Sequence, residues 1–272
     1  MKRRLLPLFF VLLSTLSTTA LAAGPLILAV SEGTSGGIDT KTALAKYHGL
    51  ASLLSKALGT GISIRFVREF AQLEAGMKAH EFDLVMARPS DYPARGLRDY
   101  GYRFVATAEP AGHCDLIVAG NSPLKSIHDL HGKTFVFPEK QAYMTRFCNA
   151  ELRDNGIDLN KESVFYVREQ GAIPFALLNG IADVGGVASY SGAVRKWTGS
   201  GQRVLHESGP QPYFPVIAGP ALSASQVAKV QATLDGLGDS DAGKAVLKQL
   251  AITGFVSTEE TRLRQLLKWL GV

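Results

Sequence analysis

The sequence predicts an α/β protein of two lobes, each a mostly parallel sheet flanked by helices, with a hinge between the lobes. Two observations predict this fold class. Short apolar runs alternate with segments of helical periodicity from Leu26 to Ala119, and the same alternation begins again at Thr134. In addition, the 272 residues are enough for two domains of medium size or one large domain.

The first 22 residues have the features of a secretory signal peptide. Residues 2–4 are cationic, Leu5–Leu13 is an uncharged apolar run, and Ala20-Leu21-Ala22 places small residues where a signal peptidase binds them. We predict cleavage after Ala22 and therefore a periplasmic location. A membrane anchor is the alternative, but the apolar run is shorter than the roughly 20 residues that span a bilayer.

The first series of strands and helices follows the signal segment. Leu26–Val30 is a short apolar run that ends in a Gly- and Ser-rich loop, which is typical of a buried strand. Thr42–Leu58 carries leucines at helical spacing and stops before Gly59, a common signal at the end of a helix. The other expected elements are the strands Ile62–Phe66, Asp83–Ala87, Phe104–Ala108 and Asp115–Ala119 and the helix Phe70–His80.

The second series is predicted from the same signals. Tyr143–Asn155 is helical in pattern and is closed by Gly156, and Ser223 with Gln226 three residues later predicts a capping box. The other expected helices are Ala172–Leu178, Tyr190–Gly199, Ser223–Leu237, Ala242–Leu250 and Thr258–Leu270, the last with a cap at Ser257 or Thr258. The expected strands are Thr134–Phe137, Val164–Val167, Val184–Val187, Val204–Glu207 and Val216–Ala218.

Two α/β series imply that the chain crosses between two lobes. We expect crossings near Gly112–Asp115 and near Pro212–Val216, so that lobe 1 holds residues 23–112 and 217–272 and lobe 2 holds residues 113–216. Ligands of open α/β sheets bind beyond the carboxyl ends of the strands. These ends would face each other across a cleft that hinge motion can close.

Composition and charge exclude several classes of function. Three of the five excess positive charges belong to the signal segment, and no long Lys/Arg run follows it, so nucleic-acid binding has no electrostatic support. The six histidines are scattered and none combines with the cysteines at zinc-site spacing, so we expect no metal and no cofactor. Nucleophile-elbow, phosphate-loop and His-Glu-x-x-His motifs are absent, so an enzyme is the less supported alternative.

The chain contains two cysteines, Cys114 and Cys148. Export to an oxidising compartment favours a disulfide between them, with a structural role in the second lobe near the hinge. Two free buried thiols are the alternative.

Four stretches of the chain resemble periplasmic solute-binding proteins of the phosphate/phosphonate type, which feed ABC importers. These are the helix from Tyr47 to Gly59, the Gly76–Ala87 strand entry, the linker Ser122–Lys133 (SPLKSIHDLHGK) and the segment Leu178–Gly185 (LNGIADVG). The resemblance implies a two-lobed type 2 periplasmic binding fold and capture of a solute. It also implies an inner-membrane ABC permease as partner.

The chain departs from this family where the ligand would bind. A Ser/Thr-rich segment in the family corresponds to Pro138–Thr145 here, and Glu139 would oppose an anion at this helix start. Gln170 stands in place of a His, and Ala188-Ser189-Tyr190 stands where the family often has an acidic residue. These departures leave the expected fold unchanged and weaken the assignment of a phosphonate ligand.

Candidate ligand residues in the first lobe follow its strands. Ser31, Thr34 and Ser35 come after the first strand, where glycines let backbone N–H groups approach a ligand. Arg88 and Ser90 end the third strand, and an Arg there can hold an oxyanion with two hydrogen bonds. The alternatives are an ordinary polar loop and a surface ion pair.

Other candidates come from helices and from the resemblance. Tyr47 either directs its hydroxyl to the ligand or is a core tyrosine. Helix N-termini bind anions readily, so at least one residue at the start of the second lobe's first helix should contact ligand. The resemblance adds two further positions. These helix and alignment candidates are Gln141, Tyr143, Met144, Thr145, Gln170 and Tyr190.

The function predicted from these observations is capture of a small oxyanion or phosphonate-like solute by closure of two lobes. The protein would act as a monomer, serve an ABC importer and carry out no covalent chemistry. The alternatives are a periplasmic sensing subunit that signals to a membrane partner, or a binding protein for an organic solute without phosphorus.

Overall fold

A computed structural model describes residues 24–33 and 38–272. The predicted signal peptide and the candidates Thr34 and Ser35 lie outside the described residues. In the part of the chain that the structure describes, no helix combines the length and the apolar character needed to span a bilayer. Within the same ranges, no cluster of three His, Cys, Asp or Glu side chains could hold a metal ion.

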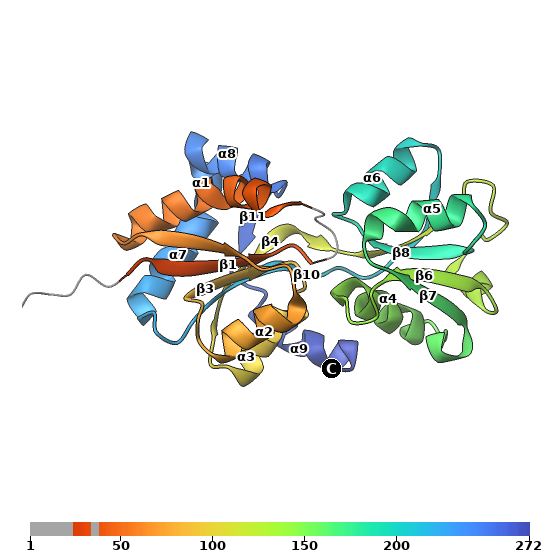
Figure 1. Cartoon of the computed structure of the whole chain (residues 1–272), viewed down its shortest axis with the longest axis horizontal. Helices are drawn as coiled ribbons and strands as arrows, with labels where there is room; N and C mark the ends of the chain where they lie inside the picture. The colour runs from red at the N-terminus through yellow and green to blue at the C-terminus, as the bar shows by residue number, and fades with distance from the viewer. Residues whose placement is uncertain (1–23, 34–37) are drawn as a thin grey trace, which may run out of the picture.

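The first lobe is built on a sheet of six strands in the order β11-β4-β10-β3-β1-β2 (Figure 1). Helices α1, α7 and α8 cover one face, and α2, α3 and α9 cover the other. The strands are β1 (Leu26–Ser31), β2 (Ile62–Phe66), β3 (Leu84–Ala87), β4 (Arg103–Gly112), β10 (Gln211–Ala218) and β11 (Gly254–Val256). The helices are α1 (Thr40–Leu58), α2 (Phe70–Lys78), α3 (Asp91–Asp99), α7 (Ala224–Asp235), α8 (Asp241–Leu250) and α9 (Glu260–Leu270).

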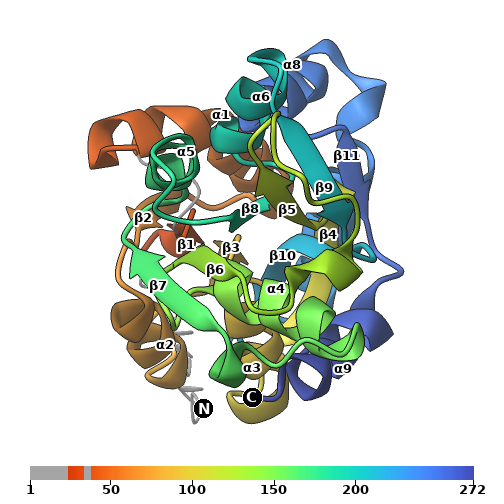
Figure 2. The same ribbon diagram turned by 90° about the vertical axis from the view of Figure 1, so that its right-hand side faces the viewer.

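The second lobe has a sheet of five strands in the order β7-β6-β8-β5-β9. Figure 2 looks along the long axis of the molecule, with α4 on one face of this sheet and α5 and α6 on the other. The strands are β5 (Cys114–Val118), β6 (Thr134–Pro138), β7 (Ser163–Val167), β8 (Val184–Ala188) and β9 (Arg203–Glu207). The helices are α4 (Tyr143–Asp154), α5 (Ile173–Leu178) and α6 (Gly192–Gly199). Short 3-10 turns lie at Ile127–Leu130, Leu159–Lys161, Gln170–Ala172 and, in the first lobe, Leu237–Asp239.

Local sequence signals explain where the helices begin and end. Asp39 caps α1 by accepting a hydrogen bond from Thr42 N, and Gly59 ends this helix at a φ of 67°, a conformation that costs glycine little. Ser223 and Gln226 form the predicted capping box of α7. The expected side-chain cap at Ser257 or Thr258 does not form, because α9 begins at Glu260 without one.

The structure adds two elements that sequence patterns did not predict, α3 and β11. Pro93 lies in the first turn of α3, where its missing N–H breaks no helical hydrogen bond, so its presence does not exclude a helix. β11 is only three residues long and pairs antiparallel with β4. Each sheet also holds antiparallel pairs beside its parallel core, because strands returning from the other lobe join it.

Two adjacent segments connect the lobes. The first runs from β4 through His113 directly into β5. The second lies between Glu207 and Gln211, upstream of the Pro212–Val216 crossing expected from sequence, because β10 already pairs with β4 from Gln211 onward. The two segments are hydrogen-bonded, with Cys114 N donating to Ser208 Oγ at 2.9 Å and Ser208 N donating to Cys114 O at 3.0 Å.

The predicted disulfide is present between Cys114 on β5 and Cys148 on α4. Both residues are fully buried, and their Cα atoms lie 5.4 Å apart. The absence of a side chain at Gly186 on β8 leaves space for the disulfide, since a Cβ at this position would lie 2.8 Å from Cys148 Sγ. The disulfide therefore ties α4 to the sheet within the second lobe, next to the first crossing segment.

Candidate functional site

A buried carboxylate, Glu32, lies at the carboxyl end of β1 and collects cationic and hydroxyl partners. Its side chain is 3% exposed, although it directly follows the strand in a polar loop. Lys46 Nζ on α1 donates to Glu32 Oε1 at 2.6 Å, and Tyr47 Oη donates to the same oxygen at 2.5 Å. Arg88, at the end of β3, places a guanidinium nitrogen 3.3 Å from Glu32 Oε2. Three segments distant in sequence therefore meet at one carboxylate.

The charges of this cluster stabilise each other against burial. Burial opposes ionisation of Glu32, but the positive charges of Arg88 and Lys46 outweigh it and lower the pKa of Glu32 below its ordinary value. Burial, together with the charge of Arg88, lowers the pKa of Lys46. Burial raises the pKa of Tyr47 well above its ordinary value, so its hydroxyl stays a hydrogen-bond donor.

Arg88 also connects the two lobes. Its guanidinium lies 5.5 Å from the ring centre of Tyr190 in the second lobe, 5.9 Å from that of Tyr213 and 5.3 Å from that of Phe214, distances at which cations are attracted to aromatic faces. Tyr190 and Tyr213 are themselves stacked with ring centres 4.2 Å apart. A buried cation of the first lobe is thus enclosed by aromatic rings from both sides of the cleft.

Three hollows along the cleft share Glu32 as a lining residue. The inner pocket has a volume of only about 10 Å³. Its main lining side chains are Glu32, Phe70 and Arg88 from the first lobe and Tyr143, Met144, Gln170 and Tyr190 from the second. The outer hollow, of about 60 Å³, lies between the loops that follow β1, β2, β6 and β7.

The third and largest of these hollows, which we call the hinge-side cavity, has a volume of about 510 Å³. It lies beside the first crossing segment, since Pro110, Ala111 and His113 line it. Its charged lining consists of Glu32, Lys46, Arg88 and Arg195. Its wall also includes Tyr190, Tyr213, Ser189 and Gly192.

The structure brings four of the sequence candidates besides Arg88 to the cleft: Tyr143, Met144, Gln170 and Tyr190 line the inner pocket. Gln170 is buried, and its Oε1 accepts a hydrogen bond from Ala188 N at 2.7 Å, which holds the loop after β8. Burial raises the pKa of Tyr143 well above its ordinary value. Which of these side chains contacts a ligand stays a prediction.

Other candidates lie outside the lining of the three hollows. Thr145 is buried and its hydroxyl donates to Pro138 O and Glu139 O, both at 3.0 Å, so it organises the loop before α4 instead of facing the cleft. Gln141 is exposed on the same loop. Ser31 and Ser90 are buried, and Ser90 Oγ donates to Arg88 O at 3.3 Å.

Sequence reasoning missed the centre of the cluster. Glu32 belongs to the loop after the first strand. In this loop the sequence pattern pointed to hydroxyl side chains and glycines as ligand contacts, and not to the acidic residue. Lys46, Tyr213 and Arg195 gave no motif that sets them apart from surface or core residues. Tyr47 was a candidate for ligand contact, yet its hydroxyl binds Glu32 and its ring lies edge-on to Phe214 in the core.

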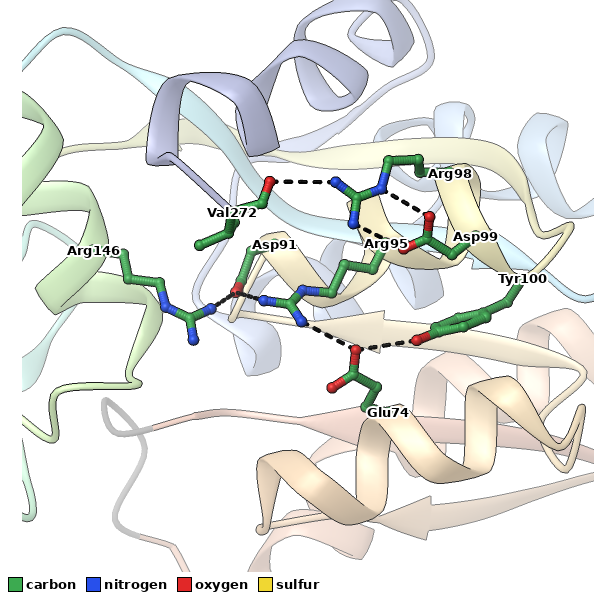
Figure 3. Close-up of polar contacts among 8 residues, drawn as sticks. All are labelled: Glu74, Asp91, Arg95, Arg98, Asp99, Tyr100, Arg146 and Val272. Carbon is green, nitrogen blue, oxygen red and sulfur yellow. Dashed lines mark hydrogen bonds and ion pairs between the residues drawn. The ribbon is translucent and has the colours of Figure 1, made fainter.

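A second polar contact joins the two lobes. Asp91 at the start of α3 is fully buried, and Arg146 on α4 of the second lobe donates to its Oδ2 at 2.6 Å (Figure 3). Arg95 lies 3.8 Å from the same oxygen and also binds Glu74. Burial, only partly offset by the charges of Arg146 and Arg95, raises the pKa of Asp91 to about 6.

Helix α9 strengthens this side of the interface. Trp269 lies edge-on to Phe147 on α4 with ring centres 5.2 Å apart, and its indole N–H donates to Asp154 Oδ2 at 2.8 Å. Arg153 in turn donates to Trp269 O at 2.9 Å. The C-terminal helix of the first lobe therefore packs directly on the second lobe, as Figure 1 shows for α9 and α4.

The comparison that decides the family is a match over most of the chain. Residues 38–263 match the family described as "ABC transporter, phosphonate, periplasmic substrate-binding protein". The chain belongs to this phosphonate-binding family of periplasmic substrate-binding proteins. Proteins of this family bind small ligands outside the cytoplasmic membrane and work with ABC permease components; the family is one of transporter proteins and not of enzymes. No curated protein sequence matches the chain.

Solved structures support the two-lobed fold. The chain is similar to XAC2383 from Xanthomonas citri bound to ATP, with 15% identity, a TM-score of 0.72 and coverage of 90% of this chain and 97% of that one. It is also similar to PhnD1 from Prochlorococcus marinus in complex with methylphosphonate, with 13% identity, a TM-score of 0.70 and the same two coverages. The aliphatic sulphonate binding protein SsuA from Escherichia coli matches at 16% identity, a TM-score of 0.61 and coverage of 91% and 86%.

Proposed function

We propose that this member of the phosphonate-binding family captures a small anionic solute in its cleft and delivers it to an ABC permease. The observation that carries the proposal is the buried cluster of Arg88, Lys46 and Glu32 where the lobes meet. Two cations face one carboxylate, so the cluster keeps an excess positive charge at a position where Glu32 and Arg88 are almost fully buried. An anion entering there is attracted more strongly than it would be at an exposed surface.

Closure of the lobes explains how a ligand would be held and released. Arg88 belongs to the first lobe and Tyr190 to the second, and the Arg88 guanidinium lies 5.5 Å from the centre of the Tyr190 ring. The two crossing segments are short, so rotation about them opens the cleft without unfolding either sheet. We propose that the mature protein acts as a monomer in the periplasm after removal of its signal peptide.

Similar proteins support an acidic ligand class. The structures similar to this chain include one with methylphosphonate, one with ATP and a sulphonate-binding protein, and each of these named ligands carries an oxyanion. The loop before α4, however, carries Glu139 and has Thr145 turned to the backbone. We therefore place the anion on Arg88 and Lys46 and not on the N-terminus of α4.

The test is a binding screen of residues 23–272 against phosphite, methylphosphonate, sulfate, alkanesulfonates, carboxylates, amino acids and cationic amines. An oxyanion that binds should raise the melting temperature. At a ligand concentration about 100-fold above the dissociation constant, the free energy of unfolding should increase by about 2.7 kcal/mol. Arg88→Gln should then weaken binding measured by calorimetry by at least about tenfold, a loss of about 1.4 kcal/mol.

Arg65→Gln is the matched control, because Arg65 is an exposed arginine of the same lobe paired with Glu81. It should leave affinity unchanged. Stabilisation by amines or neutral solutes alone, or oxyanion binding that Arg88→Gln does not weaken, would contradict the proposed function.

A further inference from the structure

We infer that the ligand occupies the hinge-side cavity and is an organic dianion, a solute with two negative charges and an apolar or aromatic body, and not a compact oxyanion such as phosphite. This inference rests on the proposed function and specifies its ligand class. It is carried by three separate properties of the cleft: the distribution of space, of charge and of aromatic surface.

Among the three hollows that described residues line with Glu32, most of the space lies on the hinge side. The hinge-side cavity measures about 510 Å³, against about 10 Å³ for the inner pocket and about 60 Å³ for the outer hollow. Cavities of roughly 300–1,000 Å³ are typical of sites for organic ligands of substantial size. The start of α4, by contrast, is filled by the buried side chains of Tyr143 and Met144. A ligand seated within the closed protein therefore has room beside the hinge and little room at α4.

Charge is also distributed unevenly along the cleft. Lys46, Arg88 and Arg195 line the hinge-side cavity against the single carboxylate of Glu32, which leaves two positive charges in excess. The outer hollow has the opposite balance: Arg68 and Arg168 face the carboxylates of Glu32, Glu69, Glu139 and Glu169. An anion is thus drawn toward the hinge and repelled from the outer opening. Two excess positive charges match a ligand that carries two negative ones.

The remaining walls of the cavity suit an organic body. The stacked rings of Tyr190 and Tyr213 line it, and Pro110, Ala111 and Ile38 add apolar surface. Arg195 comes from α6, whose first residue, Gly192, also lines the cavity. The positive end of this helix therefore adds to the attraction for a negative group near Arg195. One acidic group can bind near Arg88 and Lys46 while the body lies along the tyrosines.

The experiment compares three probes by calorimetry with residues 23–272, in mildly alkaline buffer where phosphonates carry two negative charges. The probes are phenylphosphonate, methylphosphonate and benzenesulfonate, which separate the effect of the body from that of the second charge. We expect phenylphosphonate to bind at least about tenfold more tightly than either of the others. Arg195→Gln should weaken phenylphosphonate binding by about tenfold.

Lys196→Gln is the matched control, since Lys196 is the next residue on α6, is exposed and lies outside the cavity lining. It should bind phenylphosphonate like the wild type, and both variants should melt at the wild-type temperature without ligand. Methylphosphonate or benzenesulfonate binding as tightly as phenylphosphonate would overturn the inference, as would wild-type affinity in Arg195→Gln. Failure of phenylphosphonate to bind would overturn it too.

The two proposals fail in distinguishable ways. If compact oxyanions bind in an Arg88-dependent manner while phenylphosphonate does not, the proposed function stands and the hinge-side assignment is wrong. If no oxyanion stabilises the protein, both are wrong.

Discussion

Replacing Asp91 by Asn should change how the stability of this protein depends on pH. Asp91 is fully buried at the contact between the lobes, with Arg146 at 2.6 Å and Arg95 at 3.8 Å. Its pKa is raised from 3.8 to about 6, because burial outweighs the attraction of the two arginines. The folded protein therefore binds this proton more tightly than the unfolded chain does.

The sign and the size of the effect follow from this shift. The stabilisation from the protonated carboxyl is complete below about pH 3.8 and is lost as the pH rises through about 6. A shift of this size corresponds to about 3 kcal/mol at 1.36 kcal/mol for each pKa unit. The Asp91→Asn variant has no carboxyl group to titrate at this position. As the pH rises from 4 to 7, its free energy of unfolding should therefore increase by about 2–3 kcal/mol relative to that of the wild type.

Denaturant unfolding of wild type and Asp91→Asn across this pH range measures the difference directly. Asp99→Asn is the matched control, because Asp99 is an exposed residue at the other end of α3 that pairs with Arg98 (Figure 3). It should follow the wild-type curve closely over pH 5 to 7. Parallel curves for wild type and Asp91→Asn from pH 4 to pH 7 would refute the argument that burial dominates at this site.

Two further predictions concern the second lobe. Burial, with the neighbouring charge of Glu207, raises the pKa of Asp115 from 3.8 to about 7, so Asp115→Asn should gain about 4 kcal/mol of stability relative to the wild type between pH 4 and pH 8. A stability difference that does not depend on pH would contradict this cause. Replacing Cys114 and Cys148 together by Ala should cost about 3–4 kcal/mol in denaturant unfolding, because the disulfide closes a separation of 34 residues. Reductant should lower the unfolding free energy of the wild type by a similar amount and leave that of the double variant unchanged. If reductant destabilised both proteins equally, the loss of stability would not come from the disulfide.

Much of the local structure was predictable because its causes are local. Apolar periodicity distinguishes α1 from β1, and the stop at Gly59 and the Ser223–Gln226 cap depend on residues a few positions apart. The disulfide followed from the export signal and the cysteine count. Helix α3, which contains Pro93 and Gly96, escaped prediction, and in the fold it packs on α9 and β10.

The sequence by itself determined the α/β class, the two series of elements, most of their boundaries and the resemblance to a family of solute-binding proteins. Only the tertiary structure decided where the charges of the cleft meet. Glu32, Lys46, Arg88 and the pair Tyr190 and Arg195 come from four separate segments of the chain, and no spacing rule connects these segments. Their convergence depends on how β1, β3, α1 and α6 pack across two lobes, a non-local property that short-range patterns do not encode. The same packing turns Thr145 toward backbone carbonyls and forms the hinge-side cavity among the described residues.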